Sequence, residues 1–259
     1  MATSARTHAW QRPEGARPFV LGHRGARHAA PENTERAFAL ALSEGADGVE
    51  LDVRLDRDGR VIVLHDRTLA RVSSGQETRD IEELGEEELG RVSVGGERVP
   101  LLSDVLAWAR ERRTRVNVEL KSDGSRPLAL ARAVARVVCS SGAGPECVLF
   151  SSFDPLLVAA LGVLSPALPR ALLIDRGGTV ERAATAFRWL SDGVNPHREL
   201  VTRERMAHWK DGGAIVATWT VNDEAEARRL AELGVDSIIS DEPGKILRAL
   251  GGGPAPANR

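Results

Sequence analysis

The sequence has almost no excess of either charge. Its 259 residues include 35 Lys and Arg against 37 Asp and Glu, which gives a formal net charge of −2 with the six histidines neutral. Proteins that bind nucleic acid or anionic lipid by neutralising phosphates need clusters of positive charge. The balance therefore argues against a nucleic-acid partner and against a polybasic membrane-surface protein. Its 42% hydrophobic and 28% charged residues are typical of a globular protein.

Long apolar runs and cysteines are also scarce. No run approaches the roughly 18 apolar residues that cross a bilayer, which excludes a transmembrane helix. No apolar stretch follows Arg6, Arg12 and Arg17, so an ordinary secretory signal is not expected, and we predict a cytoplasmic protein. Two cysteines, Cys139 and Cys147, are too few for a disulfide scaffold and lack histidines at zinc-ligand spacing. We interpret both as small buried hydrophobic residues.

A linker rich in Pro, Gly and Ser is missing between Phe19 and Leu250, which favours one domain over residues 18–250. We expect residues 1–17 to form a flexible tail and residues 251–259 a disordered one. Inside the domain, β-rich runs alternate with amphipathic runs. The predicted strands are Phe19–Arg24, Gly48–Val53, Arg115–Lys121, Cys147–Phe153, Arg170–Asp175, Leu190–Pro196, Ala214–Thr220 and Asp236–Asp241.

Helical patterns separate these strands, and several begin after Ser, Thr or Asp and end at Gly. They cover Thr34–Ser43, Ser103–Arg112, Arg126–Ser140, Asp154–Leu164, Val180–Phe187, Thr202–Trp209, Asp223–Leu233 and Pro243–Leu250. Eight strands, each followed by a helix, predict a parallel (β/α)8 barrel. A doubly wound open sheet is the alternative, although no glycine-rich dinucleotide fingerprint opens the first helix.

Two segments interrupt the alternation. Asp58-Gly59 lies between two β-rich runs and is a hairpin signal, and a two-residue turn cannot join parallel strands. The second barrel strand should therefore run on beyond the barrel and fold back, which returns His65 to the mouth at the strands' C-terminal ends. The other segment, Arg67–Pro100, is a small insert whose Glu82–Glu88 run we interpret as a solvated helix face.

Three carboxylates are predicted to share that mouth. Glu50 and Asp52 alternate with apolar residues and so lie on one face of the second strand, and Glu119 lies on the third. Carboxylates gathered there repel one another unless a positive group lies between them. A hard divalent cation, Mg²⁺ or Ca²⁺, prefers such oxygen ligands. The alternative is ordinary salt bridges from the nearby basic residues Arg24, Arg54 and Lys121.

Two histidines and two basic residues complete the predicted site. His23 and His65 have an unperturbed pKa near 6.5, and such a pair can supply a base and an acid in one turnover. Arg24 offers a planar fork for two phosphate oxygens, and Lys121, one of only three lysines, offers a point charge. These groups together indicate the cleavage of a phosphate ester. We expect no role for His8 and His208, and the pattern leaves the roles of His28 and His197 open.

Several short sequence motifs carry a family resemblance. They are, in order, His23-Arg24-Gly25, Pro31-Glu32-Asn33-Thr34, Glu50-Leu51-Asp52-Val53, His65-Asp66, Glu119-Leu120-Lys121, Trp219-Thr220-Val221-Asn222 and Ser240-Asp241-Glu242-Pro243. Their order and spacing over nearly the whole chain resemble the glycerophosphodiester phosphodiesterase family in its compact, cytosolic bacterial form. Two features depart from the family: Asp56 stands where many members have Thr, and the insert is short beside the larger caps of some members.

The resemblance implies a barrel that hydrolyses small-molecule glycerophosphodiesters to glycerol 3-phosphate and an alcohol, through a cyclic phosphate. It implies that one divalent cation is held at Glu50, Asp52 and Glu119, that His23 and His65 are acid and base, and that Arg24 and Lys121 contact the phosphate. Phe153 and Trp219 are similar in position to aromatic residues of the family's pocket, with core packing as the alternative. Two other functions stay open: head-group release of the lysophospholipase D or sphingomyelinase D kind, and a non-catalytic barrel that binds a phosphorylated ligand.

Overall fold

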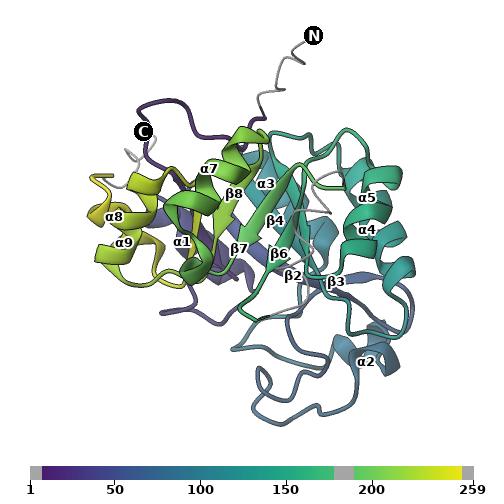
Figure 1. The fold of residues 1–259 in the computed structure, drawn as a ribbon. Coiled ribbons are helices and arrows are strands. Elements are labelled where there is room, and N and C mark those ends of the chain that lie inside the picture. The colour runs from purple at the N-terminus through teal and green to yellow at the C-terminus, as the bar shows by residue number, and fades with distance from the viewer. Residues whose placement is uncertain (1–7, 178–189, 253–259) are drawn as a thin grey trace.

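Eight parallel strands form a closed barrel. The computed structural model describes residues 8–177 and 190–252 (Figure 1). The barrel strands are β1 Phe19–His23, β2 Gly48–Leu55, β4 Arg115–Leu120, β5 Val148–Ser152, β6 Arg170–Ile174, β7 Gly193–Pro196, β8 Ile215–Thr218 and β9 Ser237–Ser240. β1 pairs with both β9 and β2, so the barrel sheet has no open edge. The fold is a TIM barrel, as predicted, and the doubly wound alternative is wrong.

Alternate residues of each strand face two different cores. Leu21, Leu149 and Ile239 point into the barrel and pack together there. Their neighbours Val20 and Ile238 point outward and pack in the layer between strands and helices. This period-two alternation follows from the pleat of a β-strand. It also carries the polar residues at the strand ends into the barrel's mouth.

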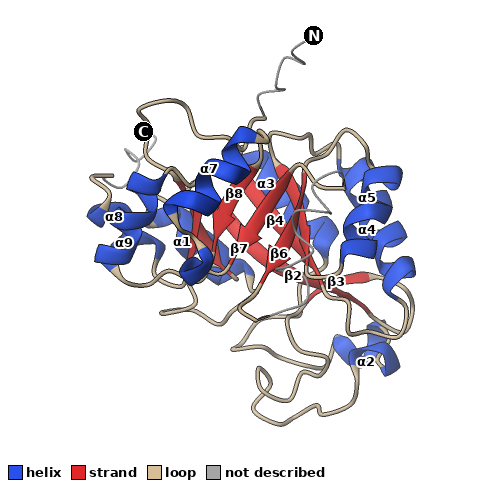
Figure 2. Cartoon of the chain, in the orientation of Figure 1, coloured by secondary structure: helices blue, strands red, loops and turns tan. Residues whose placement is uncertain are grey.

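Helices cover the outside of the barrel (Figure 2). The side chains of Thr34, Asp154, Thr202 and Asp223 each accept a hydrogen bond from a backbone N–H of the following helix, as N-caps do. The predicted helix over 180–187 lies outside the described residues. No helix in the described ranges has the length and apolar character needed to cross a membrane. Within residues 8–177 and 190–252, the helices around the barrel are α1 Glu35–Ser43, α3 Leu102–Arg112, α4 Pro127–Ser141, α5 Pro155–Leu164, α7 Arg203–Asp211, α8 Glu224–Leu233 and α9 Pro243–Ala249.

The predicted hairpin is present at the end of β2. The chain folds back into β3 Val61–Val63, and antiparallel pairing places Val53 opposite Val63. Arg54 then holds the chain beyond β3, because its Nε and Nη2 donate to the backbone oxygen of His65 at 2.8 and 2.6 Å. These bonds place His65 beside the second barrel strand.

The insert before α3 folds around a small apolar cluster of its own. The acidic run does not form the single solvated helix face that the sequence indicates. It is divided between the 3₁₀ turn Ile81–Glu83 and the short helix α2 Glu86–Leu89. Leu84, between them, is fully buried with Leu69 in this cluster. Leu84 and Gly85 both have extended backbones, and these two residues separate the 3₁₀ turn from α2.

Residues 8–17 belong to the segment predicted as a flexible tail, and they lie against the N-terminal end of the barrel. Trp10 is 1% exposed, packs with Leu21 of the inner core, and donates from Nε1 to the backbone oxygen of Pro145 at 3.0 Å. The guanidinium of Arg115, the first residue of β4, lies 5.9 Å from the Trp10 ring centroid. Trp10 therefore closes the end of the barrel opposite the mouth.

The two cysteines differ in exposure. Cys147 is buried as expected, and its Sγ lies 3.2 Å from the backbone oxygen of Thr114. Cys139 is exposed, so the expectation that both are buried is wrong for this residue. It follows Val138 on α4, and Val138 faces the core. Since consecutive helical residues point about 100° apart, Cys139 turns towards solvent.

Candidate active site

The three predicted metal-binding carboxylates meet at the mouth of the barrel. Glu50 and Asp52 lie on β2, and Asp52 pairs in register with Glu119 on the neighbouring strand β4. All three side chains belong to buried residues. One oxygen from each lies within 4.8 Å of an oxygen from each of the others. Parallel strands with alternating side chains thus produce the cluster that the sequence predicts.

Two cations already contact this cluster. Lys121 Nζ lies 2.8 Å from Asp52 Oδ1 and also pairs with Glu119. Arg24 Nε lies 3.1 Å from Asp52 Oδ2, and the backbone N–H of Arg24 donates to Glu50 Oε2 at 3.1 Å. The salt bridges that the sequence predicted as the alternative to a metal ion are therefore present for Arg24 and Lys121. This prediction is wrong for Arg54, whose partner is Asp123 outside the cluster.

Despite these two cations, the pKa values of two of the three carboxylates are raised. Burial, followed by repulsion from Asp52 and Glu119, raises the pKa of Glu50 well above its usual value. Burial likewise raises the pKa of Glu119. Only Asp52 shifts the other way: burial opposes its ionisation, but Lys121 and Arg24 lower its pKa. Three buried carboxylates with oxygen donors alone fit a hard divalent cation, which would supply the missing positive charge.

Each of the two predicted catalytic histidines has an aspartate behind it. His23 Nδ1 lies 2.7 Å from Asp241 Oδ1, and His65 Nδ1 lies 2.6 Å from Asp66 Oδ1. A carboxylate at Nδ1 fixes the proton on that nitrogen and leaves Nε2 to exchange protons. His23 Nε2 faces the carboxylate cluster, 3.9 Å from Glu50 Oε2. Burial lowers the pKa of both histidines, which favours their neutral form.

The other histidines lie elsewhere. His28 contacts the backbone oxygen of Asp241 at 3.0 Å through Nδ1, so it supports the mouth from outside. The His197 ring lies edge-on to Trp219, with 5.4 Å between centroids. His208 is exposed on α7.

Phe153 and Trp219 form an aromatic wall of the mouth. Their rings meet edge to face with 5.6 Å between centroids. Trp219 is anchored by its Nε1, which donates to the backbone oxygen of Asn195 at 2.8 Å. Phe153 is 36% exposed at the end of β5, so it is not a core residue. This exposed ring is available to the carbon atoms of a ligand.

Several residues that orient the site were not assigned a role from the sequence. Asp241 accepts a hydrogen bond from Asn222 Nδ2 at 2.7 Å, and Asn33 Nδ2 donates to Asp52 Oδ2 at 3.0 Å. Arg24 and Asn33 both have left-handed backbones, with φ values of 54° and 56°. All of these residues belong to the sequence motifs that carry the family resemblance, but a motif alone does not show which side chains contact one another.

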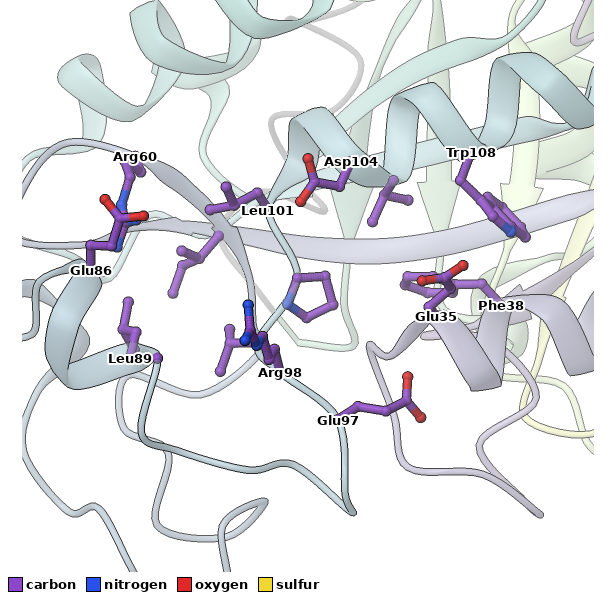
Figure 3. Close-up of a pocket in the computed structure, with 15 residues that line it drawn as sticks. Glu35, Phe38, Arg60, Glu86, Leu89, Glu97, Arg98, Leu101, Asp104 and Trp108 are labelled. Carbon is purple, nitrogen blue, oxygen red and sulfur yellow. The ribbon is translucent and has the colours of Figure 1, made fainter.

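One cavity lies outside the barrel, away from the mouth. This cavity of about 550 Å³ opens between α1, α3 and the insert, with Phe38, Leu101 and Trp108 among its lining residues (Figure 3). Arg98 and Glu35 line it as well. None of the predicted site residues borders this cavity, so it is separate from the mouth.

Comparison with known proteins assigns the chain. Residues 23–245 match the model of the glycerophosphoryl diester phosphodiesterase family. The chain belongs to this family. A glycerophosphodiester phosphodiesterase from Caldanaerobacter subterraneus subsp. tengcongensis is 30% identical over 88% of this chain and 96% of its own length. The protein is therefore a phosphoric diester hydrolase.

Solved structures agree with this assignment. An Oleispira antarctica phosphodiesterase in complex with the product sn-glycerol-3-phosphate has a TM-score of 0.81 and 27% identity, over 91% of this chain and 98% of that one. A glycerophosphodiester phosphodiesterase from Agrobacterium tumefaciens has a TM-score of 0.77 and 27% identity, over 91% of this chain and all of its own. This phosphodiesterase shares their barrel along nearly its whole length.

Proposed function

We propose that this phosphodiesterase cleaves glycerophosphodiesters to sn-glycerol 3-phosphate and an alcohol by acid–base catalysis at His23 and His65. The observation that carries the proposal is the pairing of each histidine with its own aspartate beside one buried carboxylate cluster. Cleavage of a phosphodiester needs positive charge near the phosphate, which a cation held by these carboxylates would supply, and oriented imidazoles that move protons. The related structure that holds sn-glycerol-3-phosphate supports the choice of product.

Glu50, Asp52 and Glu119 would hold one Mg²⁺ or Ca²⁺, which draws charge from the phosphate oxygens when bound. Arg24 and Lys121 flank the same carboxylates and would bind the remaining phosphate oxygens. Phe153 and Trp219 would contact the carbon atoms of the substrate.

Protons then pass between the substrate and each of the two histidines. One imidazole takes the proton from the glycerol hydroxyl next to the phosphate, and that oxygen attacks phosphorus. The other, as imidazolium, gives its proton to the oxygen of the departing alcohol. The bond to that alcohol breaks and a cyclic phosphate remains. Water then opens the ring with the proton roles reversed. Asp241 and Asp66 stabilise each imidazolium as it forms.

The test is release of glycerol 3-phosphate from glycerophosphocholine and glycerophosphoethanolamine by chelator-stripped protein, with Mg²⁺ and Ca²⁺ added back separately. We expect one ion to restore turnover on both substrates, because a small cap leaves the alcohol side of the mouth open. If neither ion restores turnover, these substrates are wrong. Mass analysis of products from lysophospholipids would then identify head-group release, with or without a cyclic phosphate product.

A further inference from the structure

Arg71 lies in the insert and contacts two carboxylates at once. Its Nε donates to Asp66 Oδ2 at 2.7 Å. Its Nη1 and Nη2 donate to the two carboxylate oxygens of Glu32 at 2.9 and 2.7 Å. Asp66 is the residue behind His65, so one guanidinium joins that histidine to Glu32. A guanidinium suits this task, because it presents several donors in one rigid plane.

Glu32 in turn contacts two more arginines. Arg24 Nη1 donates to Glu32 Oε1 at 2.9 Å. Arg27 Nη1 lies 3.6 Å from Glu32 Oε2, and Arg27 Nε lies 3.2 Å from Asp241 Oδ1. Asp241 is the residue behind His23. Glu32 is therefore the shared centre of ion pairs that lead to both aspartates.

The burial of Glu32 makes these contacts more than ordinary surface ion pairs. The Glu32 side chain is only 11% exposed, whereas Arg71 is 49% exposed. Exposed ion pairs contribute little, but a largely buried carboxylate with a bidentate arginine has a fixed geometry. Burial alone would raise the pKa of Glu32, yet the hydrogen bonds from Arg71 and the charge of Arg24 lower it. Glu32 is thus held as a carboxylate between its arginines.

We propose that Glu32 and Arg71 are positioning residues that fix the two catalytic histidines relative to each other. Arg71 orients His65 through Asp66, and Glu32 joins this pair to Arg27, Asp241 and His23. The insert therefore takes part in catalysis through Arg71 although it supplies no group to the reaction. This inference rests on the proposed function, since it requires that both histidines move protons.

The chain offers a matched control pair in the same insert. Arg79 is 48% exposed and makes a bidentate contact to Glu77, which is 13% exposed. These values are almost equal to those of Arg71 and Glu32. The contacts between Glu77 and Arg79 do not include Asp66 or Asp241. R79A and E77Q therefore remove an equivalent ion pair that does not lead to a histidine.

The experiment compares kcat for glycerophosphocholine in R71A, E32Q, R79A and E77Q, with a thermal melt of each. We expect R71A and E32Q to lose about tenfold or more in kcat, and the two control variants to stay within about twofold of wild type. Added guanidinium ion should recover part of the R71A activity. It should recover none of the activity of the double variant R71A/E32Q, because the ion can take the place of the Arg71 side chain only by pairing with the Glu32 carboxylate. R71K should recover less than the guanidinium ion does, since an ammonium lacks the fork.

Two results would overturn the inference. The first is an R71A enzyme as active as R79A. The second is an R71A loss that follows a lowered melting temperature and does not respond to guanidinium, which would make the role structural. Inactive wild-type protein in the same assay would instead contradict the proposed function, so the two failures are distinguishable.

Discussion

At the residue scale, the surroundings of a histidine decide what it can do. His23 and His65 each hold an aspartate oxygen within 2.7 Å of Nδ1. His208 has the same intrinsic chemistry but is exposed on α7, on the outside of the barrel. An imidazole is useful in catalysis when its tautomer and direction are fixed, and an exposed side chain has neither fixed.

Under the proposed mechanism, substitution of either His23 or His65 should therefore abolish most of the activity. We expect H23A and H65A each to lose about 10²-fold or more in kcat, the usual scale of general acid–base catalysis. H208A should retain wild-type turnover and serves as the control. Steady-state kinetics on glycerophosphocholine measure all three. Turnover near the wild-type value in both H23A and H65A would remove these residues from the mechanism.

Asp66 predicts a dependence of stability on pH. Burial opposes its ionisation, but the hydrogen bonds from Arg71 and His65 lower its pKa to about 2 in the folded protein. The unfolded value is about 3.9. A lowered folded pKa means that the ionised form stabilises the fold above about pH 4, and this contribution disappears as the pH falls through about 2.

The contribution of Asp66 is measured by comparison with D66N. Because the side chain is partly exposed, we expect about 1 kcal/mol at pH 7 in the free energy of unfolding. Urea unfolding of wild type and D66N should differ by this amount at pH 5 and should converge towards pH 2. A difference that stays constant over this range would show that the ionised form of Asp66 does not stabilise the fold.

At the element scale, the turn from β1 to α1 depends on close contact of two backbones. Gly25 has a φ of +83°, and a Cβ placed there would lie 2.5 Å from the backbone carbon of Ala37 on α1. Only glycine has both the conformation and the size that this turn requires. The turn follows His23 directly, so it also sets the position of this histidine at the end of β1.

Gly59, at the tip of the β2–β3 hairpin, is a matched control for this turn. Its φ is +81°, almost the same as that of Gly25, but a Cβ there would meet no atom within 4 Å. We expect G59A to cost about 1 kcal/mol from backbone strain alone. G25A should cost about 2 kcal/mol or more beyond that, since α1 must move. Equal urea midpoints for G25A and G59A would contradict this account.

At the scale of the whole molecule, the two ends of the barrel have different tasks. The mouth holds charged groups whose burial opposes their ionisation, as the raised pKa of Glu50 shows. The opposite end is closed by Trp10, which packs into the inner core and bonds to Pro145. In TIM barrels the mouth carries the chemistry and the other end contributes stability.

Removal of the Trp10 side chain should therefore lower stability without changing catalysis. We expect W10A to lose about 3–5 kcal/mol in the free energy of unfolding, as buried Trp-to-Ala substitutions do. W10F should lose less, because it keeps a ring and gives up the hydrogen bond to Pro145. The kcat of the folded fraction should equal wild type in both. A large change in kcat with little change in stability would show that this end is coupled to the mouth.

Local patterns in the amino-acid sequence are sufficient to predict the barrel and the groups at its mouth. Alternating apolar residues, helix caps and the Asp58-Gly59 turn are local signals, and they predicted the strands, most helices and the hairpin correctly. Glu50, Asp52 and Glu119 could be placed together because strands of a parallel barrel end at one mouth. Periodicity and strand direction are sufficient for such inferences.

The partners of these groups, in contrast, depend on contacts between residues far apart in the chain. Asp241 lies 218 residues from His23 in the chain, and Arg54 pairs with Asp123 rather than with the carboxylate cluster. The burial of Trp10 likewise depends on Pro145, which is 135 residues away. Such contacts have no local signature, because they arise from the closure of the barrel and from the loops at its ends. The sequence therefore predicts which side chains lie at the mouth of this phosphodiesterase, and the fold determines their partners and their orientation.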